Sequence, residues 1–446
     1  MGVKDSANAI YQVESESAHV REDEVPRGYK RTEVGVIPED WEVVQFRNIV
    51  GQYVDYRGRT PTKLGMSWGG GDILALSANN VQMGRIAPEL EANYGSEELY
   101  RRWMKQGACE HRDVLLTMEA PLGNVAQVPD TRKYILSQRV LLIKPNKLVT
   151  RDFLADYLQG DVFQVLLTQS STGSTALGIQ RRVLDQLPVC FPERLAEQEA
   201  IAEALGDADA LIESLQQLIA KKRAIKQGAM QALLTGRQRL SDFSGRWSRD
   251  ELKRLVASPI TDGPHLTPTF YESGVPFLSV NNLVNNKIDL SDLRYISKQD
   301  DEIFARKCKP RLGDVLIGKA ASVGKVAIVE NNLNFNIWSP IALIRSSKHI
   351  FPKFLYYQLL SADCISQIML RTNASSQGNI GMADIETIQI AYPPFEEQTA
   401  IAAVLSDMDA EIEALEARLA KIRALKAGIM QALLTGRIRL PLDRAA

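Results

Sequence analysis

The chain has 446 residues, which is more than one ordinary domain holds, so its length predicts two or more domains. Hydrophobic residues make up 45% and charged residues 24%, a composition typical of a soluble globular protein and not of a disordered one. The net charge of −1 counts against a nucleic-acid binder that acts alone, because contacts with phosphates usually leave a basic excess.

The segment Met1 to Lys30 is polar, mixed in charge and without the apolar core of a signal peptide. No apolar run in the chain reaches the length that a membrane-spanning helix needs. We therefore expect a cytoplasmic protein without membrane contact. Residues 1–34 are treated as an N-terminal extension without an assigned role.

The spacing of the cysteines and histidines supports neither a metal site nor a disulfide. The four histidines lack metal-ligand spacing, and no CxxC pair occurs among Cys109, Cys190, Cys308 and Cys364. We expect four buried free thiols and no metal site.

Two segments, 35–195 and 241–395, alternate short β-type runs with turn residues and one or two helices. The β-type runs are Asp72–Leu76, Val114–Thr117, Arg139–Ile143, Asp314–Ile317 and Ile341–Ile344. Mixed α+β domains are the expected class. Residues 41–195 carry a net charge of about +2 and residues 246–395 about +3. Because these excesses are small, we expect that in any DNA-binding role a partner would supply much of the electrostatic attraction.

Each of these segments is followed by a near-copy of one helical segment. Glu197 to Leu240 aligns without a gap to Glu397 to Leu440, with about 28 of 44 positions identical. We expect helical segments at 196–240 and 396–440, with a short tail at 441–446.

Both helical segments carry apolar heptads, which predict a coiled-coil seam. Its expected residues are Ile201, Leu205, Ile212, Leu215, Ile219, Ile401, Leu405, Ile412, Leu415 and Leu419. We favour pairing of the two helices with each other, as an antiparallel coiled coil, over packing of each helix on its own domain. About 38 helical residues span roughly 57 Å, so the pair would act as a spacer.

Gly236 and Gly436 are expected C-caps. Gly228 and Gly428 lie inside the helices, where close helix approach is the expected reason.

A weaker repeat precedes each helix. Leu76-Ser-Ala-Asn-Asn80 matches Leu278-Ser-Val-Asn-Asn282, and Leu122-Gly-Asn-Val-Ala126 matches Val323-Gly-Lys-Val-Ala327. Together with the opening segment Gly35-Val-Ile-Pro-Glu-Asp-Trp41, the duplicated order resembles the specificity subunits of Type I restriction–modification systems. The resemblance covers nearly the whole chain from about Gly35 onward.

The resemblance implies a non-catalytic subunit with two target-recognition domains, 35–195 and 241–395, separated and joined by the two helices. Each domain would read one half of an asymmetric, bipartite site in double-stranded DNA. The helices would set the gap and dock two methyltransferase subunits, with motor and nuclease subunits joining through the complex. No cofactor is expected in this chain, and S-adenosylmethionine is expected in the methyltransferase partner.

Polar loops rich in hydrogen-bond donors supply the candidate DNA contacts. In the first half they are Tyr56, Arg57, Arg59, Thr60, Lys63, Asn79, Asn80, Gln82, Ser137, Gln138 and Arg139. In the second half they are His265, Thr267, Thr269, Asn281, Asn282, Lys319, Ser375, Ser376 and Gln377. The asparagine pairs have an alternative role as capping residues of turns.

Catalytic motifs are missing, and no catalytic residue is predicted. Tyr392-Pro-Pro-Phe395 resembles the Pro-Pro-aromatic motif of adenine methyltransferases, but tyrosine stands where that motif needs Asp or Asn. No phosphate-binding GxxxxGK[ST] run occurs. Two alternatives stay open: the recognition subunit of a related restriction enzyme, and a coiled-coil scaffold that binds proteins or other ligands.

Overall fold

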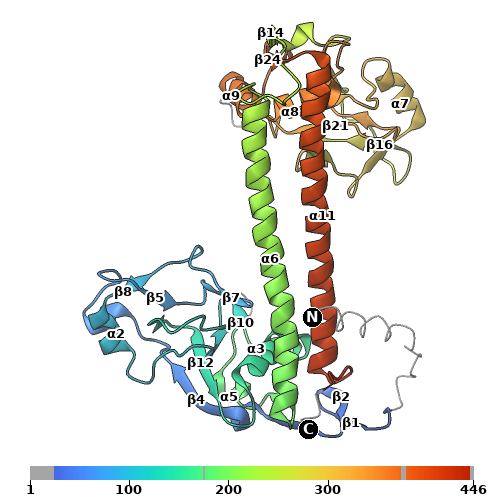
Figure 1. Ribbon diagram of the computed structural model, residues 1–446. Coiled ribbons are helices and arrows are strands. Elements are labelled where there is room, and N and C mark those ends of the chain that lie inside the picture. Colours follow the sequence, from blue (N-terminus) through green and yellow to red (C-terminus); the bar gives the residue numbers. More distant parts are fainter. Residues whose placement is uncertain (1–24, 174–175, 373–377, 442–446) are drawn as a thin grey trace. The chain divides into compact units, whose positions relative to one another are not determined.

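The computed structural model describes residues 25–173, 176–372 and 378–441, which divide into two compact units. Unit 1 extends to Ser214 and resumes at Ala420, and unit 2 is Leu215–Leu419. The boundary runs through two long helices, α6 (Leu195–Leu233) and α11 (Phe395–Leu434), so each unit contains part of both (Figure 1).

Unit 1 is built on a four-stranded antiparallel sheet in the order β10–β9–β12–β4. Its strands are β4 (Val50–Asp55), β9 (Val114–Met118), β10 (Leu122–Gln127) and β12 (Val140–Pro145). Successive side chains of a strand point to opposite faces. Leu116 and Leu141 therefore pack against helices, while Leu115 and Leu142 pack against a second, three-stranded sheet. The sheet is buried on both faces.

The other elements of unit 1 cover these faces or connect them. The second sheet contains β11 (Ile135–Leu136), β5 (Ile73–Leu76) and β8 (Tyr94–Gly95). The paired short strands are β1 (Tyr29–Thr32) with β2 (Gly35–Pro38), β3 (Trp41–Gln45) with β13 (Pro188–Pro192), and β6 (Val81–Gln82) with β7 (Arg85–Ile86). The helices are η1 (Phe46–Ile49), η2 (Pro61–Leu64), α2 (Glu97–Trp103), α3 (Arg151–Gln159), α4 (Asp161–Gln169) and α5 (Arg181–Leu184).

Unit 2 repeats this plan with a sheet in the order β15–β23–β20–β21. Its strands are β15 (Thr261–Asp262), β20 (Val315–Gly318), β21 (Val326–Ile328) and β23 (Ile341–Ile344). The second sheet contains β19 (Arg294–Ile296), β16 (Val275–Leu278) and β22 (Asn336–Ile337). The paired short strands are β14 (Ser248–Glu251) with β24 (Gln389–Tyr392), and β17 (Leu283–Val284) with β18 (Lys287–Ile288). The helices are η3 (Leu252–Arg254), η4 (Val280–Asn282), α7 (Lys298–Ala305), α8 (Pro352–Leu359), α9 (Ala362–Arg371) and α10 (Met382–Glu386).

The two helices pair in antiparallel orientation within each unit. In unit 2, Lys222 forms an ion pair with Glu411 at 2.6 Å, and Lys226 with Asp409. In unit 1, Lys426 contacts Asp209 at 2.5 Å. Of the expected seam residues, Ile212 and Leu415 are half-buried, and the others are buried. The predicted α+β class with an antiparallel coiled coil is confirmed.

The four glycines expected to matter for the long helices divide into two kinds. Gly236 and Gly436 both have φ of +68°, the left-handed conformation of a helix C-cap, as predicted. The expectation that Gly228 and Gly428 permit close helix approach is wrong, because a Cβ built at either position meets no atom within 4 Å.

Two reciprocal ion pairs, here called the Glu–Arg clasps, connect the start of one helix to the segment after the other. In unit 1, Arg439 donates to both carboxylate oxygens of the buried Glu197, at 2.8 and 2.6 Å. In unit 2, Arg239 donates to both oxygens of the buried Glu397, each at 2.5 Å. The repeat duplicates the residues of both clasps, in the segments Glu197-Gln198 and Glu397-Gln398 and in the Arg-x-Arg segments Arg237–Arg239 and Arg437–Arg439, and these glutamates and arginines have a structural role.

The glutamine beside each clasp fastens its helix to the adjacent domain. Gln198 accepts from the Thr150 amide at 2.9 Å and donates to two backbone carbonyls. Gln398 accepts from the Phe351 amide at 2.7 Å and also donates to two carbonyls. Both glutamines are buried with their polar atoms paired, as a buried amide requires.

All four cysteines are buried and free, as expected. Burial raises the pKa of the Cys190 thiol to about 12, which disfavours the reactive thiolate. In the described parts of the chain, no helix combines the length and the apolar character needed to cross a membrane.

Candidate nucleic-acid interface

The loop after β4 carries the first group of predicted contacts. Arg57 is exposed and held by Asp55, whose carboxylate accepts from its backbone amide at 3.0 Å and from its guanidinium at 2.6 Å. Lys63 donates to the carbonyl of Gly58. These contacts fold the loop back on itself, so its cations have defined positions at the surface.

Tyr56 and Arg59 support this loop from below. Tyr56 is buried, and its hydroxyl accepts from the Gln106 amide at 2.8 Å. Arg59 donates to the carbonyl of Trp103 at 2.6 Å, and its guanidinium lies 5.5 Å from the centre of the Tyr56 ring. The buried tyrosine has its hydroxyl committed to the protein, so its place in the structure favours a positioning role over direct DNA contact.

The paired asparagines separate into one buried and one exposed residue in each unit. Asn80 is buried, accepts from the Ser77 amide at 2.8 Å and donates to the carbonyls of Ala75 and Glu91. Asn282 makes the matching bonds in unit 2, accepting from the Ser279 amide at 2.9 Å. The structure therefore places Asn80 and Asn282 as turn-stabilising residues and leaves Asn79 and Asn281 exposed.

A pocket of about 510 Å³ gathers six of the predicted contacts of unit 1. They come from three separate stretches of the chain and are Arg59, Thr60, Asn79, Ser137, Gln138 and Arg139. The pocket is also lined by Trp68 and Asn93, which the sequence did not single out. Gln82, a further predicted contact, is half-buried and donates to the carbonyl of Asn79 at 2.9 Å.

Arg139 stands at this pocket with a side chain that is 49% exposed and lies 3.4 Å from Glu119. Its φ of +71° is in the left-handed region, which residues other than glycine rarely adopt. Ser137 is buried, and its backbone amide donates to the carbonyl of Leu76. Of the lining side chains, arginine, asparagine and glutamine are those that recognise base edges by paired hydrogen bonds.

In unit 2 the predicted contacts His265 and Lys319 meet at one carboxylate. His265 Nε2 is 3.1 Å from Asp262, and Lys319 Nζ is 2.8 Å from the same group. Lys307, which the sequence analysis missed, is a third neighbour; the basic run Arg306-Lys307-Cys308-Lys309 was the signal for it. Thr267 and Thr269 are exposed. The predicted Ser375, Ser376 and Gln377 lie outside the described residues.

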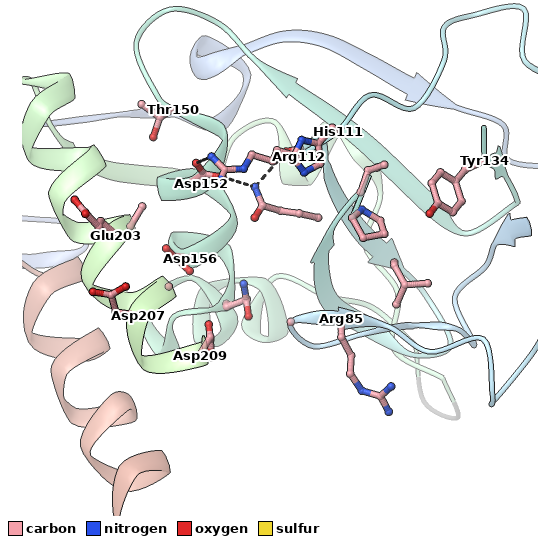
Figure 2. Close-up of a pocket in the computed structure, with 18 of the residues that line it drawn as sticks. Arg85, His111, Arg112, Tyr134, Thr150, Asp152, Asp156, Glu203, Asp207 and Asp209 are labelled. Atoms are coloured by element: carbon pink, nitrogen blue, oxygen red, sulfur yellow. Dashed lines mark hydrogen bonds and ion pairs between the residues drawn. The ribbon is translucent and has the colours of Figure 1, made fainter. Parts of the chain in front are cut away.

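A larger cleft of about 990 Å³ lies in unit 1 between α3, the β6–β7 hairpin and α6 (Figure 2). Carboxylates line its α3 and α6 side, and Figure 2 labels them as Asp152, Asp156, Glu203, Asp207 and Asp209. Arg112 contacts Asp152 at 2.6 Å, and burial raises the pKa of Asp156 to about 7. Such an acidic wall repels phosphates, so this cleft suits a protein partner better than DNA.

Comparison with known proteins gives a consistent result. The family model described as the Type I restriction modification DNA specificity domain matches residues 38–221 and 262–424. A protein of Methanocaldococcus jannaschii, assigned as the specificity subunit of the type I restriction enzyme MjaX, is 27% identical over 434 residues. That match covers 92% of this chain and 97% of the relative. The EcoBI specificity subunit of Escherichia coli is 24% identical over 333 residues. That match covers 68% of this chain and 69% of the relative.

Solved structures share the fold. The crystal structure of a Type I restriction–modification S subunit from M. genitalium has a TM-score of 0.56 at 14% identity, covering 88% of this chain and 96% of that one. A chain from a structural study of complex assembly in a type I system has a TM-score of 0.55 at 19% identity. The match covers 90% of this chain and 99% of that one.

Proposed function

Because this chain belongs to the Type I restriction modification DNA specificity domain family, it recognises DNA sequence for a restriction–modification complex, and we propose that its two units each read one half of a bipartite target. The supporting observation is the pocket of unit 1, where side chains from three distant stretches converge at the surface. Asn79, Gln138 and Arg139 are its exposed members suited to base edges.

The two half-sites differ in sequence on this proposal. Unit 1 presents Gln138 and Arg139 at its pocket, whereas unit 2 presents Thr267, Thr269 and Asn281 at exposed positions. Different donors prefer different bases, and a chain with two different readers prefers an asymmetric target. The domain boundaries predicted from the sequence, 35–195 and 241–395, remain part of this proposal.

The paired helices would serve two roles, as a spacer between half-sites and as the docking surface for two methyltransferase subunits. The acidic side of the cleft in Figure 2, with Glu203 and Asp207 on α6, supports a protein partner there. S-adenosylmethionine would bind the methyltransferase, and motor and nuclease subunits would join through the complex. This chain would supply recognition and no catalytic group.

Methylation across the genome tests the proposal directly. Single-molecule sequencing would compare the source strain, a deletion of this gene, and the deletion complemented with the wild-type gene. We expect a split, asymmetric adenine-methylated motif that disappears on deletion and returns on complementation. If the methyltransferase partner is expressed and active and the pattern does not change on deletion, the proposal fails and a scaffold function gains support.

A further inference from the structure

One carboxylate of unit 2 is surrounded by three basic side chains. Asp262, with a side chain only 7% exposed, lies 2.5 Å from Lys307 Nζ, 2.8 Å from Lys319 Nζ and 3.1 Å from His265 Nε2. The three basic residues come from the segment after α7, the segment after β20 and the loop after β15. The fold has therefore brought them together around this one acid.

Backbone contacts hold Lys319 and the loop that carries His265. Lys319 donates its amide to the carbonyl of Pro340 at 2.8 Å, and its carbonyl accepts from Ile380 at 2.9 Å. The His265 loop is held at Pro264, whose carbonyl accepts from the Ser339 amide at 3.3 Å. A side chain at Gly263 would collide with the Ile337 carbonyl, 1.8 Å from the added Cβ, so only glycine fits this path.

The charge of the group favours an anion. Burial alone would raise the pKa of Asp262, but the hydrogen bonds and charges of Lys307 and Lys319 outweigh it and hold that pKa below its ordinary value. One ionised carboxylate between two ammonium groups leaves one uncompensated positive charge, with His265 counted as neutral. Each ammonium has three donors, so neither is exhausted by Asp262.

The exposed members define where a ligand would approach. The side chains of His265 and Lys307 are 70% and 53% exposed, whereas that of Lys319 is 13% exposed. The group thus has a buried base, formed by Asp262 and Lys319, and an accessible rim.

Unit 1 has a carboxylate at the same place in its sheet. Asp55 pairs with Leu141, which pairs with Leu116, and Asp262 pairs with Ala342, which pairs with Ile317. Leu116 and Ile317 occupy matching positions of the repeat, so Asp55 and Asp262 are equivalent. Asp55 holds Arg57 from its own loop. Each unit places a cation beside this acid, although the cations come from different parts of the chain.

We propose that Asp262 is a positioning residue that presents Lys307, Lys319 and His265 as a binding site for one backbone phosphate of the target DNA, beside the half-site read by unit 2. This inference rests on the proposed function and adds the residues that anchor the second half-site. A phosphate contact of this kind fixes the position of the domain on the duplex and adds no base preference of its own.

The test uses the assembled methyltransferase complex and a duplex containing the motif found by methylation sequencing. Lys307→Ala should weaken binding about tenfold and lower the slope of log affinity against log salt by about 1. Lys307→Arg should restore most of the affinity. The matched control is Lys348→Ala, which removes an exposed lysine beyond the other end of β23 in the same unit.

Two further measurements separate positioning from bulk charge. Asp262→Asn adds positive charge to the complex, so a simple charge effect would tighten binding, whereas a positioning role predicts weaker binding. A series of duplexes with one neutral methylphosphonate each should contain one position, in the second half-site, that weakens the wild type but not Lys307→Ala. Thermal unfolding shows whether Asp262→Asn is folded. Methylation of duplexes that carry base changes in the first half-site shows whether unit 1 of this variant is intact.

The outcomes distinguish this inference from the function on which it rests. A wild-type complex without preference for the motif would contradict the proposed function itself. A wild-type complex that reads the motif, together with a Lys307→Ala complex of unchanged salt slope and unchanged methylphosphonate profile, would overturn only the phosphate site.

Discussion

Arg139 combines an unusual backbone with an exposed side chain at the candidate interface. Its φ of +71° places it in a region that costs a residue with a Cβ about 1 kcal/mol or more. The Met118 amide donates to its carbonyl at 2.8 Å, so the surrounding sheet holds the conformation in place. Strain of this kind gathers at functional sites, where the side chain has a use that glycine cannot supply.

Substitution of Arg139 should separate stability from recognition. We expect Arg139→Gly to raise the free energy of unfolding by about 1 kcal/mol, because glycine adopts positive φ freely. The same variant should lose discrimination at one base pair of the first half-site by roughly 1–3 kcal/mol. Thermal unfolding and methylation-motif sequencing measure the two effects. Arg139→Ala, which keeps the strain, is the control, and full specificity in both variants would contradict the assignment.

Residue type and loop position selected six residues that line one pocket of unit 1, but they did not predict the orientation of the side chains. Asn79 and Asn80 are adjacent and identical, and only the turn around Ser77 decides that Asn80 faces inward. Tyr56 stands in a polar loop, yet Trp103 and Gln106, some fifty positions later, bury it. The part of the site that could not be predicted is the part determined by distant packing.

The long helices contain three glycines with open surroundings, and two of them, Gly228 and Gly428, occupy matching positions of the repeat. A Cβ at Gly228 or Gly428 would meet no atom within 4 Å, although glycine inside a helix costs about 1 kcal/mol relative to alanine. The chain itself therefore gives no packing reason for either residue.

Replacing both glycines should stabilise the helices. We expect Gly228→Ala and Gly428→Ala each to raise the free energy of unfolding by about 1 kcal/mol, measured by thermal unfolding of the isolated chain. Assembly with the methyltransferase, measured by analytical ultracentrifugation, is the second readout. A stabilised double variant that no longer assembles would show that the partner approaches the helices at these positions. A double variant with a lower free energy of unfolding than the wild type would contradict the conclusion that both glycines have open surroundings.

The packing of α3 beside α6 makes unit 1 sensitive to pH through Asp156. Burial raises the pKa of Asp156 to about 7, aided by Asp209 and Asp152 and opposed by Lys426. The folded state therefore binds this proton more tightly than the unfolded state does. The resulting stabilisation is fully present below about pH 4 and is lost as pH rises through about 7.

Asp156→Asn removes this dependence. At pH 8 we expect the variant to be more stable than the wild type by about 1 kcal/mol or more, with the advantage shrinking toward pH 5. Differential scanning calorimetry across this range measures it, and Asp207→Asn, an exposed carboxylate in the same cleft, is the control. Equal pH profiles for the Asp156 variant and the wild type would contradict the assignment.

For the whole molecule, the repeat was the most informative property of the sequence. Apolar heptads predicted the seam, and the five β-type runs predicted strands, one of them, Ile341–Ile344, to the residue and the others with ends displaced by one or two residues. The duplicated Glu-Gln and Arg-x-Arg segments could not be interpreted in advance, because their partners lie in the other copy of the repeat. Ion pairs between residues about 160 and 240 positions apart have no local signature.

Lengthening both helices tests the spacer role. One heptad inserted between Ser214 and Leu215, and one between Leu419 and Ala420, adds about 10 Å of helix and keeps the seam in register. We expect the gap of the methylated motif to grow by about three base pairs, with both half-site sequences unchanged. An insertion in one helix only should disrupt pairing. An unchanged gap in the double insertion would remove the spacer proposal.

The Glu–Arg clasps have a consequence for how such genes change. Each clasp joins a glutamate from one copy of the repeat to an arginine from the other, and both copies supply the same two residue types at matching positions. A recombination event within the repeated DNA would therefore leave both clasps intact while exchanging one recognition domain for another. Natural variants of this chain should accordingly differ by whole domains, and new targets should arise by shuffling halves rather than by gradual substitution.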